Sequence, residues 1–136
     1  MSVSAEQRSA VAPRRARVLV VDDEPIVLRS LRRSLSEHEV VTASNVDQGL
    51  ALYQSRDFDI VFCDLMMPET NGLVFYARLC ELGPEHARRL VLMTGGIFSD
   101  RLGCSMSELP HPCLLKPFTN DQLERCIDQA LAEQGR

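Results

Sequence analysis

The sequence predicts an α/β domain built around a parallel β-sheet. The chain has 136 residues, the size of one ordinary domain with a single core. Short apolar runs rich in valine and leucine alternate with longer segments whose apolar residues recur at helical spacing. This alternation is typical of βα units that pack helices against a parallel sheet. Five such units follow one another, and we expect one domain over residues 17–134 after a flexible extension at residues 1–16.

The first two units each pair a short strand with a helix. Residues 17–21 (RVLVV) form a strand by their length and valine content, and Pro25 suits the first turn of the following helix. A second strand is predicted at residues 39–43. Ser44, with Asp47 three residues later, resembles an N-cap pair and predicts that the second helix begins there.

The third unit carries an acidic residue at the end of its strand. Residues 59–63 (DIVFC) read as a buried strand that runs directly into Asp64. The loop that follows ends at Gly72, which we interpret as a turn residue with positive φ. A helix is then predicted over about residues 73–82, and Gly83 ends it.

The fourth unit combines a regular strand with an irregular helix. Residues 89–93 (RLVLM) form the strand, which closes on Thr94. Residues 97–112 contain helical spacing interrupted by glycine and proline, so we expect a short or irregular helix there. A brief fifth strand follows at residues 113–115 and ends at Lys116.

The last helix has a recognisable start signal. Thr119 and Gln122 form a capping box, in which each side chain bonds the backbone N–H of the other residue. The apolar residues that follow recur at helical spacing, which predicts one buried face. They are Leu123, Ile127, Ala130 and Leu131.

Composition excludes several classes of protein. A net charge of −4 argues against direct nucleic-acid binding, which usually needs a strongly basic face. The five cysteines are scattered without a C-x-x-C pair, which fits reduced thiols better than a disulfide framework or a zinc site. No apolar run long enough to span a membrane and no secretory leader is present, so we expect a cytoplasmic protein without membrane insertion.

Chemically capable side chains stand where the predicted strands end. Asp22 and Asp23 follow the first strand, Asp64 the third, Thr94 the fourth and Lys116 the fifth. In an open parallel sheet the carboxyl ends of the strands form the ligand-binding edge. We therefore expect these five residues to share one site.

Three carboxylates in one crevice imply a bound cation. Without one, their mutual repulsion would raise the pKa of at least one of them. Oxygen-only ligation with retained water favours Mg²⁺. A lysine and a threonine hydroxyl beside these acids suit the oxygens of a phosphoryl group, and a carboxylate can act as the covalent nucleophile in phosphoryl transfer. The predicted chemistry is therefore formation of an aspartyl phosphate.

Four segments of the chain resemble the signature segments of response-regulator receiver domains. They are VLVVDDEP, DIVFCDLMMPETNG, VLMTGG and LLKPF, in family order and each at the end of a predicted strand. The resemblance covers about residues 17–132 and is closest to the receiver modules of hybrid sensor histidine kinases. It implies a flavodoxin-like (βα)5 fold with strand order 2-1-3-4-5 and helices on both faces of the sheet.

The resemblance also implies a set of metal ligands. Asp23 and Asp64 would bind Mg²⁺ directly, and Asp22 mainly through water. The backbone carbonyl of Met66 would complete the ligands that the protein supplies.

The roles implied for the phosphoryl group follow in the same way. Asp64 would accept the phosphoryl group from a phosphohistidine. Lys116 would pair with it, and Thr94 would move toward it to signal phosphorylation. The Lys116–Pro117 peptide bond is cis in the family.

Partners follow from the same resemblance. The donor would be a histidine kinase or a histidine phosphotransfer domain, and a weak homodimer is a further expectation. Such a domain catalyses its own phosphorylation and has no separate substrate, so it is not counted as an enzyme.

The chain departs from the family pattern at three positions. Cys113 stands where receivers commonly have an aromatic residue that is coupled to the threonine. Met66 and Gly96 stand where polar side chains help water to attack the acyl phosphate. We predict a long-lived phosphoryl group and a readout that does not use rotation of an aromatic ring.

Two alternatives remain open from the residues alone. A phosphatase of the haloacid-dehalogenase type also uses an aspartate nucleophile at the end of a strand, but it needs a second aspartate where this chain has Met66. A degenerate receiver that acts only as a scaffold is the other. The presence of all the acids, the threonine and the lysine argues against it.

Overall fold

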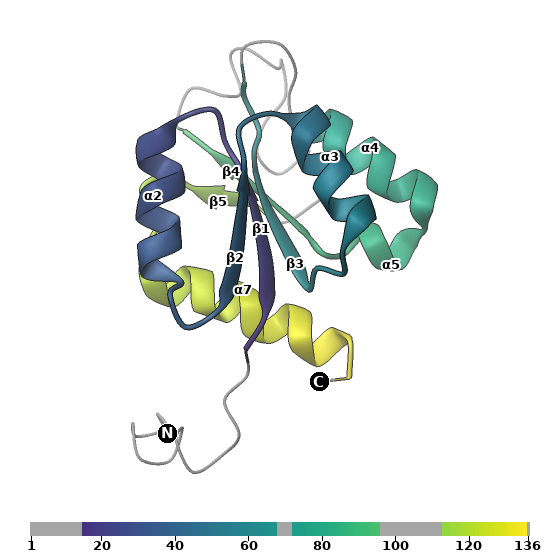
Figure 1. The fold of residues 1–136 in the computed structure, drawn as a ribbon. Coiled ribbons are helices and arrows are strands. Elements are labelled where there is room, and N and C mark those ends of the chain that lie inside the picture. Colours follow the sequence, from purple (N-terminus) through teal and green to yellow (C-terminus); the bar gives the residue numbers. More distant parts are fainter. Residues whose placement is uncertain (1–14, 68–71, 96–112, 136) are drawn as a thin grey trace.

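A computed structural model describes residues 15–67, 72–95 and 113–135 of the chain (Figure 1). The irregular helix expected at residues 97–112 lies outside these ranges, as does Gly96. Within them, no helix is both long enough and apolar enough to cross a membrane.

Five parallel strands form one sheet in the order β2-β1-β3-β4-β5. The predicted strand order and fold class are thereby confirmed. The three inner strands are almost fully buried because helices cover both faces, which explains their continuous apolar sequences. The strands are β1 (Arg17–Val21), β2 (Glu39–Ala43), β3 (Ile60–Asp64), β4 (Leu90–Thr94) and β5 (Cys113–Leu115).

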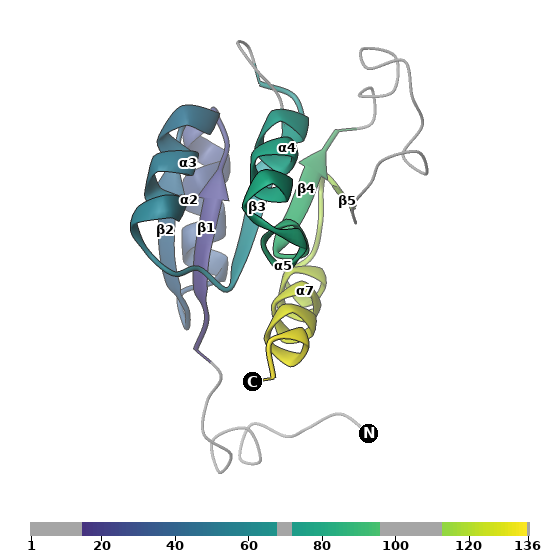
Figure 2. The same cartoon turned by 90° about the vertical axis from the view of Figure 1, so that its right-hand side faces the viewer.

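Helices cover the sheet from both sides (Figures 1 and 2). Helices α2 (Pro25–Ser34) and α7 (Asn120–Glu133) pack on one face. Helices α3 (Val46–Ser55), α4 (Gly72–Leu82) and α5 (Pro84–Ala87) pack on the other. The result is a three-layer arrangement that leaves the two ends of the strands as the edges of the molecule.

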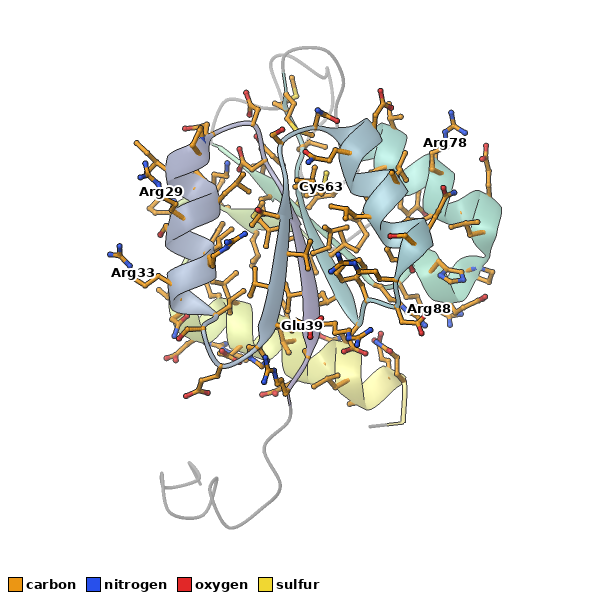
Figure 3. All side chains as sticks on the ribbon, viewed as in Figure 1. Arg29, Arg33, Glu39, Cys63, Arg78 and Arg88 are labelled. Carbon is orange, nitrogen blue, oxygen red and sulfur yellow. The ribbon has the colours of Figure 1, made fainter. Side chains whose placement is uncertain are left out.

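Side chains of each inner strand alternate between two hydrophobic cores. In β3, Val61 and Cys63 belong to the core under α3 and α4, whereas Phe62 belongs to the core under α2 and α7. Figure 3 shows Cys63 inside the molecule and Arg29 and Arg33 projecting outward from α2. Because side chains alternate along a strand, the side chain of Asp64 lies on the opposite face of the sheet from that of Cys63.

The start of α3 differs from the prediction by one residue. Its N-cap is Asn45, whose side chain accepts a hydrogen bond of 2.7 Å from the Gln48 N–H. Ser44 instead donates from its N–H and its hydroxyl to the Gln48 side chain, at 2.8 and 3.1 Å. Asn and Ser are nearly equal as caps, so propensity alone could not choose between two adjacent candidates.

Strand limits also differ slightly. Strands β3 and β4 begin and end one residue later than predicted, so that Asp64 and Thr94 are the last residues of their strands. Helix α5 was not predicted, since four residues are too few to show a helical period. The capping box of α7 is confirmed, with both of its hydrogen bonds present.

Gly72 does not have the predicted positive φ. It is the first residue of α4 and is buried. Positive φ occurs instead at Gly83, where the chain turns from α4 into α5 with φ 142°.

The amino ends of the strands form the edge opposite the predicted site. Here the N–H of Ala16 donates to Nδ1 of the buried His38, whose Nε2 lies 3.0 Å from Glu124 of α7. Near the end of the chain, the side-chain amide of Gln134 donates to the carbonyl of Asp59 just before β3. Both ends of the described chain are therefore tied to this edge.

Candidate functional site

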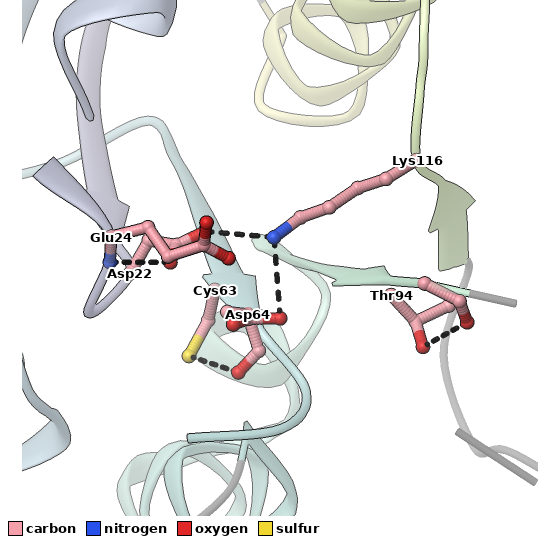
Figure 4. A network of polar contacts seen from close by, with 7 residues as sticks. Asp22, Glu24, Cys63, Asp64, Thr94 and Lys116 are labelled. Atoms are coloured by element: carbon pink, nitrogen blue, oxygen red, sulfur yellow. Dashed lines mark hydrogen bonds and ion pairs between the residues drawn. The ribbon is translucent and has the colours of Figure 1, made fainter. Parts of the chain in front are cut away.

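Three of the predicted site residues, Asp22, Asp64 and Lys116, come together at the carboxyl edge of the sheet (Figure 4). Asp22 and Asp23 follow β1, Asp64 ends β3, and Lys116 follows β5. Because β1 and β3 are neighbours and both are buried, their final residues emerge side by side at this edge.

Three carboxylates lie together there. Asp22, Asp23 and Asp64 each place an oxygen so that all three atoms lie within 4.8 Å of one another. Asp22 and Asp64 are buried, whereas Asp23 is exposed at the mouth of the site. The cluster can therefore be reached from solvent on the side of Asp23.

Lys116 supplies the positive charge that faces this cluster. Its Nζ lies 3.0 Å from Asp22 Oδ2 and 3.6 Å from Asp64 Oδ1. The Lys116–Pro117 bond is cis, as expected. The lysine thus lies between the two buried carboxylates.

Burial and repulsion act together on Asp64. Removal of its carboxyl group from water and the neighbouring charge of Asp22 raise its pKa to about 6, with a smaller contribution from Asp23. Lys116 and a hydrogen bond from the backbone of Met66 counteract this rise. Asp64 is therefore harder to ionise than an ordinary aspartate, and a bound cation would favour the ionised form.

Lys116 is held in its charged form by its neighbours. Burial by itself would lower its pKa, but the hydrogen bond to Asp22 and the charges of Asp64 and Asp22 raise the pKa overall. Lys116 is therefore cationic throughout the physiological range.

Asp22 uses both of its oxygens within the protein. Oδ1 accepts a 3.0 Å hydrogen bond from the N–H of Glu24, and Oδ2 accepts from Lys116. Glu24 is the N-cap of α2, and its carboxylate also contributes to the raised pKa of Lys116. The sequence pattern assigned no role to Glu24, although it directly follows Asp22 and Asp23 in the chain.

The backbone around Asp64 is held from two directions. The N–H of Leu65 donates to the carbonyl of Met93 at 2.7 Å, which extends the β3–β4 pairing past Asp64. The N–H of Gly72 donates to the carbonyl of Leu65 at 2.9 Å, which ties the start of α4 to the same segment.

Thr94 lies at the end of β4 and is fully buried. Its hydroxyl donates to the carbonyl of Gly95 at 3.1 Å, whereas the N–H of Lys116 donates to the carbonyl of Thr94 at 2.7 Å. In Figure 4 the side chain of Thr94 stands apart from the contacts that join Asp22, Lys116 and Asp64. The structure thus joins the acids and the lysine directly and connects the threonine to them through the backbone.

The chemistry of these side chains fits Mg²⁺. Three carboxylates converge on one point, and one lysine neutralises only part of their charge. The ligand atoms are all oxygens, and the exposure of Asp23 leaves room for the water that Mg²⁺ retains.

Comparison with known proteins gives one family for this arrangement. The family model described as the response regulator receiver domain matches residues 18–128. This range contains the five strands, except Arg17 at the start of β1, and the three carboxylates of Asp22, Asp23 and Asp64, which we call the carboxyl-edge cluster.

Three curated relatives illustrate the match. The chain is 32% identical over 127 residues to the hydrogenase transcriptional regulatory protein HoxA of Cupriavidus necator, covering 92% of this chain and 26% of that protein. It is 36% identical over 112 residues to the alginate biosynthesis transcriptional regulatory protein AlgB of Pseudomonas aeruginosa, covering 81% and 24%. It is 31% identical over 124 residues to the transcriptional regulatory protein BtsR of Escherichia coli, covering 88% and 50%. The chain therefore spans between a quarter and a half of the length of these relatives.

Solved structures agree with the fold. A response regulator receiver domain protein from Clostridium thermocellum has a TM-score of 0.73 and 26% identity, over 88% of this chain and 97% of that one. The receiver domain of an HD domain-containing protein from Pseudomonas fluorescens Pf-5 has a TM-score of 0.71 and 27% identity, over 90% and 98%.

Proposed function

This chain belongs to the response regulator receiver domain family, and from that premise we propose that Asp64 accepts a phosphoryl group from the phosphohistidine of a histidine kinase or a histidine phosphotransfer domain. The observation that carries the proposal is the buried carboxylate of Asp64 at the end of β3, 3.6 Å from Lys116 and beside two further carboxylates. The bond from phosphorus to the histidine nitrogen breaks as the bond to a carboxylate oxygen of Asp64 forms.

Asp64 must be ionised to act as the nucleophile. With a pKa of about 6 it is mostly, but not fully, ionised at neutral pH. Bound Mg²⁺ would supply positive charge that favours the carboxylate and neutralises the phosphoryl oxygens. Asp23 and Asp64 are the proposed direct ligands, with Asp22 contributing through water and Met66 through its carbonyl.

Lys116 is the proposed partner of the phosphoryl group. Its ammonium group is already directed at Asp64 and needs to exchange only its contact with Asp22 for one with a phosphoryl oxygen. Thr94 is the proposed second donor. Its hydroxyl would leave the Gly95 carbonyl and turn toward the new group.

The family match supports the receiver function and gives no support to hybrid kinases in particular. The three relatives described above are named as transcriptional regulatory proteins and are two to four times as long as this chain. We propose self-phosphorylation without a separate substrate and assign no output activity to the chain.

Acetyl phosphate with Mg²⁺ provides the test, with intact-mass spectrometry as the measurement. The native chain should gain the mass of one phosphoryl group, and Asp64→Asn should not. Asp59→Asn is a matched control, because Asp59 is also a buried aspartate but lies at the opposite end of β3. Loss of the adduct in Asp59→Asn alone, or its persistence in Asp64→Asn, would contradict the proposal.

A second experiment separates a working receiver from a scaffold. Beryllium fluoride with Mg²⁺ mimics an acyl phosphate without a chemical step. Formation of a complex that depends on Asp64, seen in ¹⁵N NMR spectra, is the expected result. Unchanged spectra of the native chain would support the alternative that it is a degenerate receiver acting only as a scaffold.

A further inference from the structure

We propose that Gly72 is a positioning residue of the phosphoacceptor site: its lack of a side chain lets α4 lie directly against the backbone that carries Asp64. This inference rests on the proposed function, since it concerns the geometry of the same Mg²⁺ and phosphoryl site. It concerns a glycine of α4, which the acidic cluster does not include.

The first observation is a close approach of backbone to backbone. A Cβ atom built on Gly72 would lie 3.1 Å from the carbonyl oxygen of Asp64 and 3.2 Å from Cα of Leu65. It would also lie 2.6 Å from Cδ2 of Leu92. Ordinary van der Waals contacts of a Cβ atom begin at about 3.4 Å, so even alanine would force a shift.

The second observation is that neither β3 nor α4 can easily move away from this contact. Strand β3 pairs with β1 and β4 on its two sides, and Leu65 continues the pairing with Met93. Helix α4 is anchored by Phe75 and Leu79, both fully buried in the core. A side chain at position 72 would therefore press on the backbone of Asp64 and Leu65, which it would contact directly.

The third observation links this segment to the metal site. Gly72 bonds the carbonyl of Leu65, and Leu65 stands between Asp64, the proposed nucleophile, and Met66, the proposed carbonyl ligand. A bound Mg²⁺ tolerates little departure from octahedral geometry. Loss of residues that orient metal ligands typically weakens metal binding tenfold or more.

Gly72→Ala tests the proposal, and Gly49→Ala is its matched control. The Cβ of a residue at position 49 would meet only side chains, namely Val21 at 2.8 Å and Phe75 at 3.0 Å. Both substitutions crowd the same core, but only the first presses on the backbone of Asp64. By titration calorimetry with Mg²⁺, we expect Gly72→Ala to bind about tenfold more weakly than the native chain and Gly49→Ala to bind like it.

Leu92→Val distinguishes backbone displacement from ordinary crowding. It removes the δ-methyl groups, the nearest atoms to the added Cβ, and leaves the contact with Asp64 in place. Combined with Gly72→Ala, it should leave Mg²⁺ binding weak. Recovery of native affinity in the double variant would overturn the proposal, as would native affinity in Gly72→Ala itself.

A measurement on the native chain decides the matter if Gly72→Ala does not fold. With ¹⁵N-labelled glycine, Mg²⁺ should shift the amide resonance of Gly72, which donates to the carbonyl of Leu65, more than that of Gly49, which donates to the carbonyl of Asn45, the N-cap of α3. Equal or absent shifts at Gly72 while the protein binds Mg²⁺ would overturn the positioning role alone. A native chain that binds no Mg²⁺ would overturn the proposed function together with the inference.

Discussion

The ionised form of Asp64 is the one that the proposed phosphoryl transfer requires, but it lowers the stability of the fold. Its carboxyl group is almost fully buried beside Asp22, and burial is the larger cause of its raised pKa. The proposed nucleophile therefore opposes folding at neutral pH in the absence of a cation.

The dependence of stability on pH follows with a definite sign. The pKa of Asp64 is about 6 in the fold against 3.8 for an ordinary aspartate, so its protonation favours the fold below about pH 4, and this contribution is lost as the pH rises through 6. In buffer without Mg²⁺, Asp64→Asn should match the native chain in urea unfolding at pH 4. At pH 7 it should be more stable by about 1 kcal/mol, a figure reduced for solvent screening.

The comparison cancels the titration of every shared group that does not interact with Asp64. A stability difference that stays constant from pH 4 to pH 7 would contradict the raised pKa of Asp64. Excess Mg²⁺ should reverse the order of stability at pH 7, since it should bind the chain with the Asp64 carboxylate more tightly than the variant that lacks it.

Cysteine reactivity should follow burial rather than position in the sequence. Burial and the nearby charges of Asp64 and Asp22 raise the pKa of Cys63 far above its usual range, and burial raises the pKa of Cys113 to about 11. Cys80 is exposed. Because the thiolate is the reactive form, iodoacetamide at pH 8 should label Cys80 before the other cysteines of the described ranges, and Cys113 roughly a hundredfold more slowly than a free cysteine.

Peptide mass spectrometry measures these rates, and urea-unfolded protein is the control in which all the thiols should react alike. Cys63 should be labelled only when the chain unfolds. Labelling of native Cys63 at the rate of Cys80 would show that the strand before Asp64 opens readily.

The sequence could predict where some residues lie, whereas the contacts of others depend on how separate segments approach one another in space. Asp22, Asp64 and Lys116 were predicted because a strand end is visible in the sequence and parallel strands end at one edge. The contacts of Glu24 and Gly72 were not predicted, because no local sequence pattern connects either residue to the segment that it approaches.

At the scale of the helix, α7 depends on its capping box. The Thr119 hydroxyl accepts from the Gln122 N–H at 3.1 Å, and the Gln122 side chain accepts from the Thr119 N–H at 2.7 Å. Thr119→Ala leaves the Gln122 N–H without its side-chain acceptor and should lower the free energy of unfolding by about 1 kcal/mol.

Urea unfolding checks this through the midpoint, which should fall without a change in slope. Thr119→Ser keeps the hydroxyl and should behave like the native chain. A loss of stability equal in both variants would assign the effect to the threonine methyl group rather than to the cap.

Elements were predictable where their pattern was long enough. Strands β1, β2 and β5 and the starts of α2 and α7 agree with the sequence because valine runs, Pro25 and the Thr119 box are strong local signals. Strand β3 begins one residue later than predicted, at Ile60. Asp59 lies just before it, and its side chain accepts a hydrogen bond from the N–H of Arg17. Helix α5 is a single turn and carries no period to detect.

For the whole molecule, the binding of Mg²⁺ should appear as stability. A ligand that binds only the folded chain at ten times its dissociation constant adds about 1.4 kcal/mol. The thermal midpoint of the native chain should rise by several degrees, which corresponds to about 2–6 °C for a domain of this size. Asp64→Asn and Asp23→Asn should each show a clearly smaller rise, because each loses a proposed ligand.

Differential scanning calorimetry with and without Mg²⁺ makes the measurement, and Asp59→Asn should respond like the native chain. Equal rises in all four proteins would show that Mg²⁺ stabilises the fold through some other site. The carboxyl-edge cluster would then have no measurable affinity for the ion.

Both ends of the described chain are fastened to the amino edge of the sheet, Ala16 through His38 and Gln134 through Asp59, while Asp64 opens at the other edge. The points where another domain could be attached and Asp64 therefore lie at opposite edges of the sheet. A fluorescent protein joined directly before Arg15 or directly after Gly135 would begin about one strand length away from Asp64, at the opposite edge of the sheet. Because of this separation, an attached module would not contact Asp64 directly. A biosensor built this way would report a change at Asp64 through small movements of the sheet and its helices.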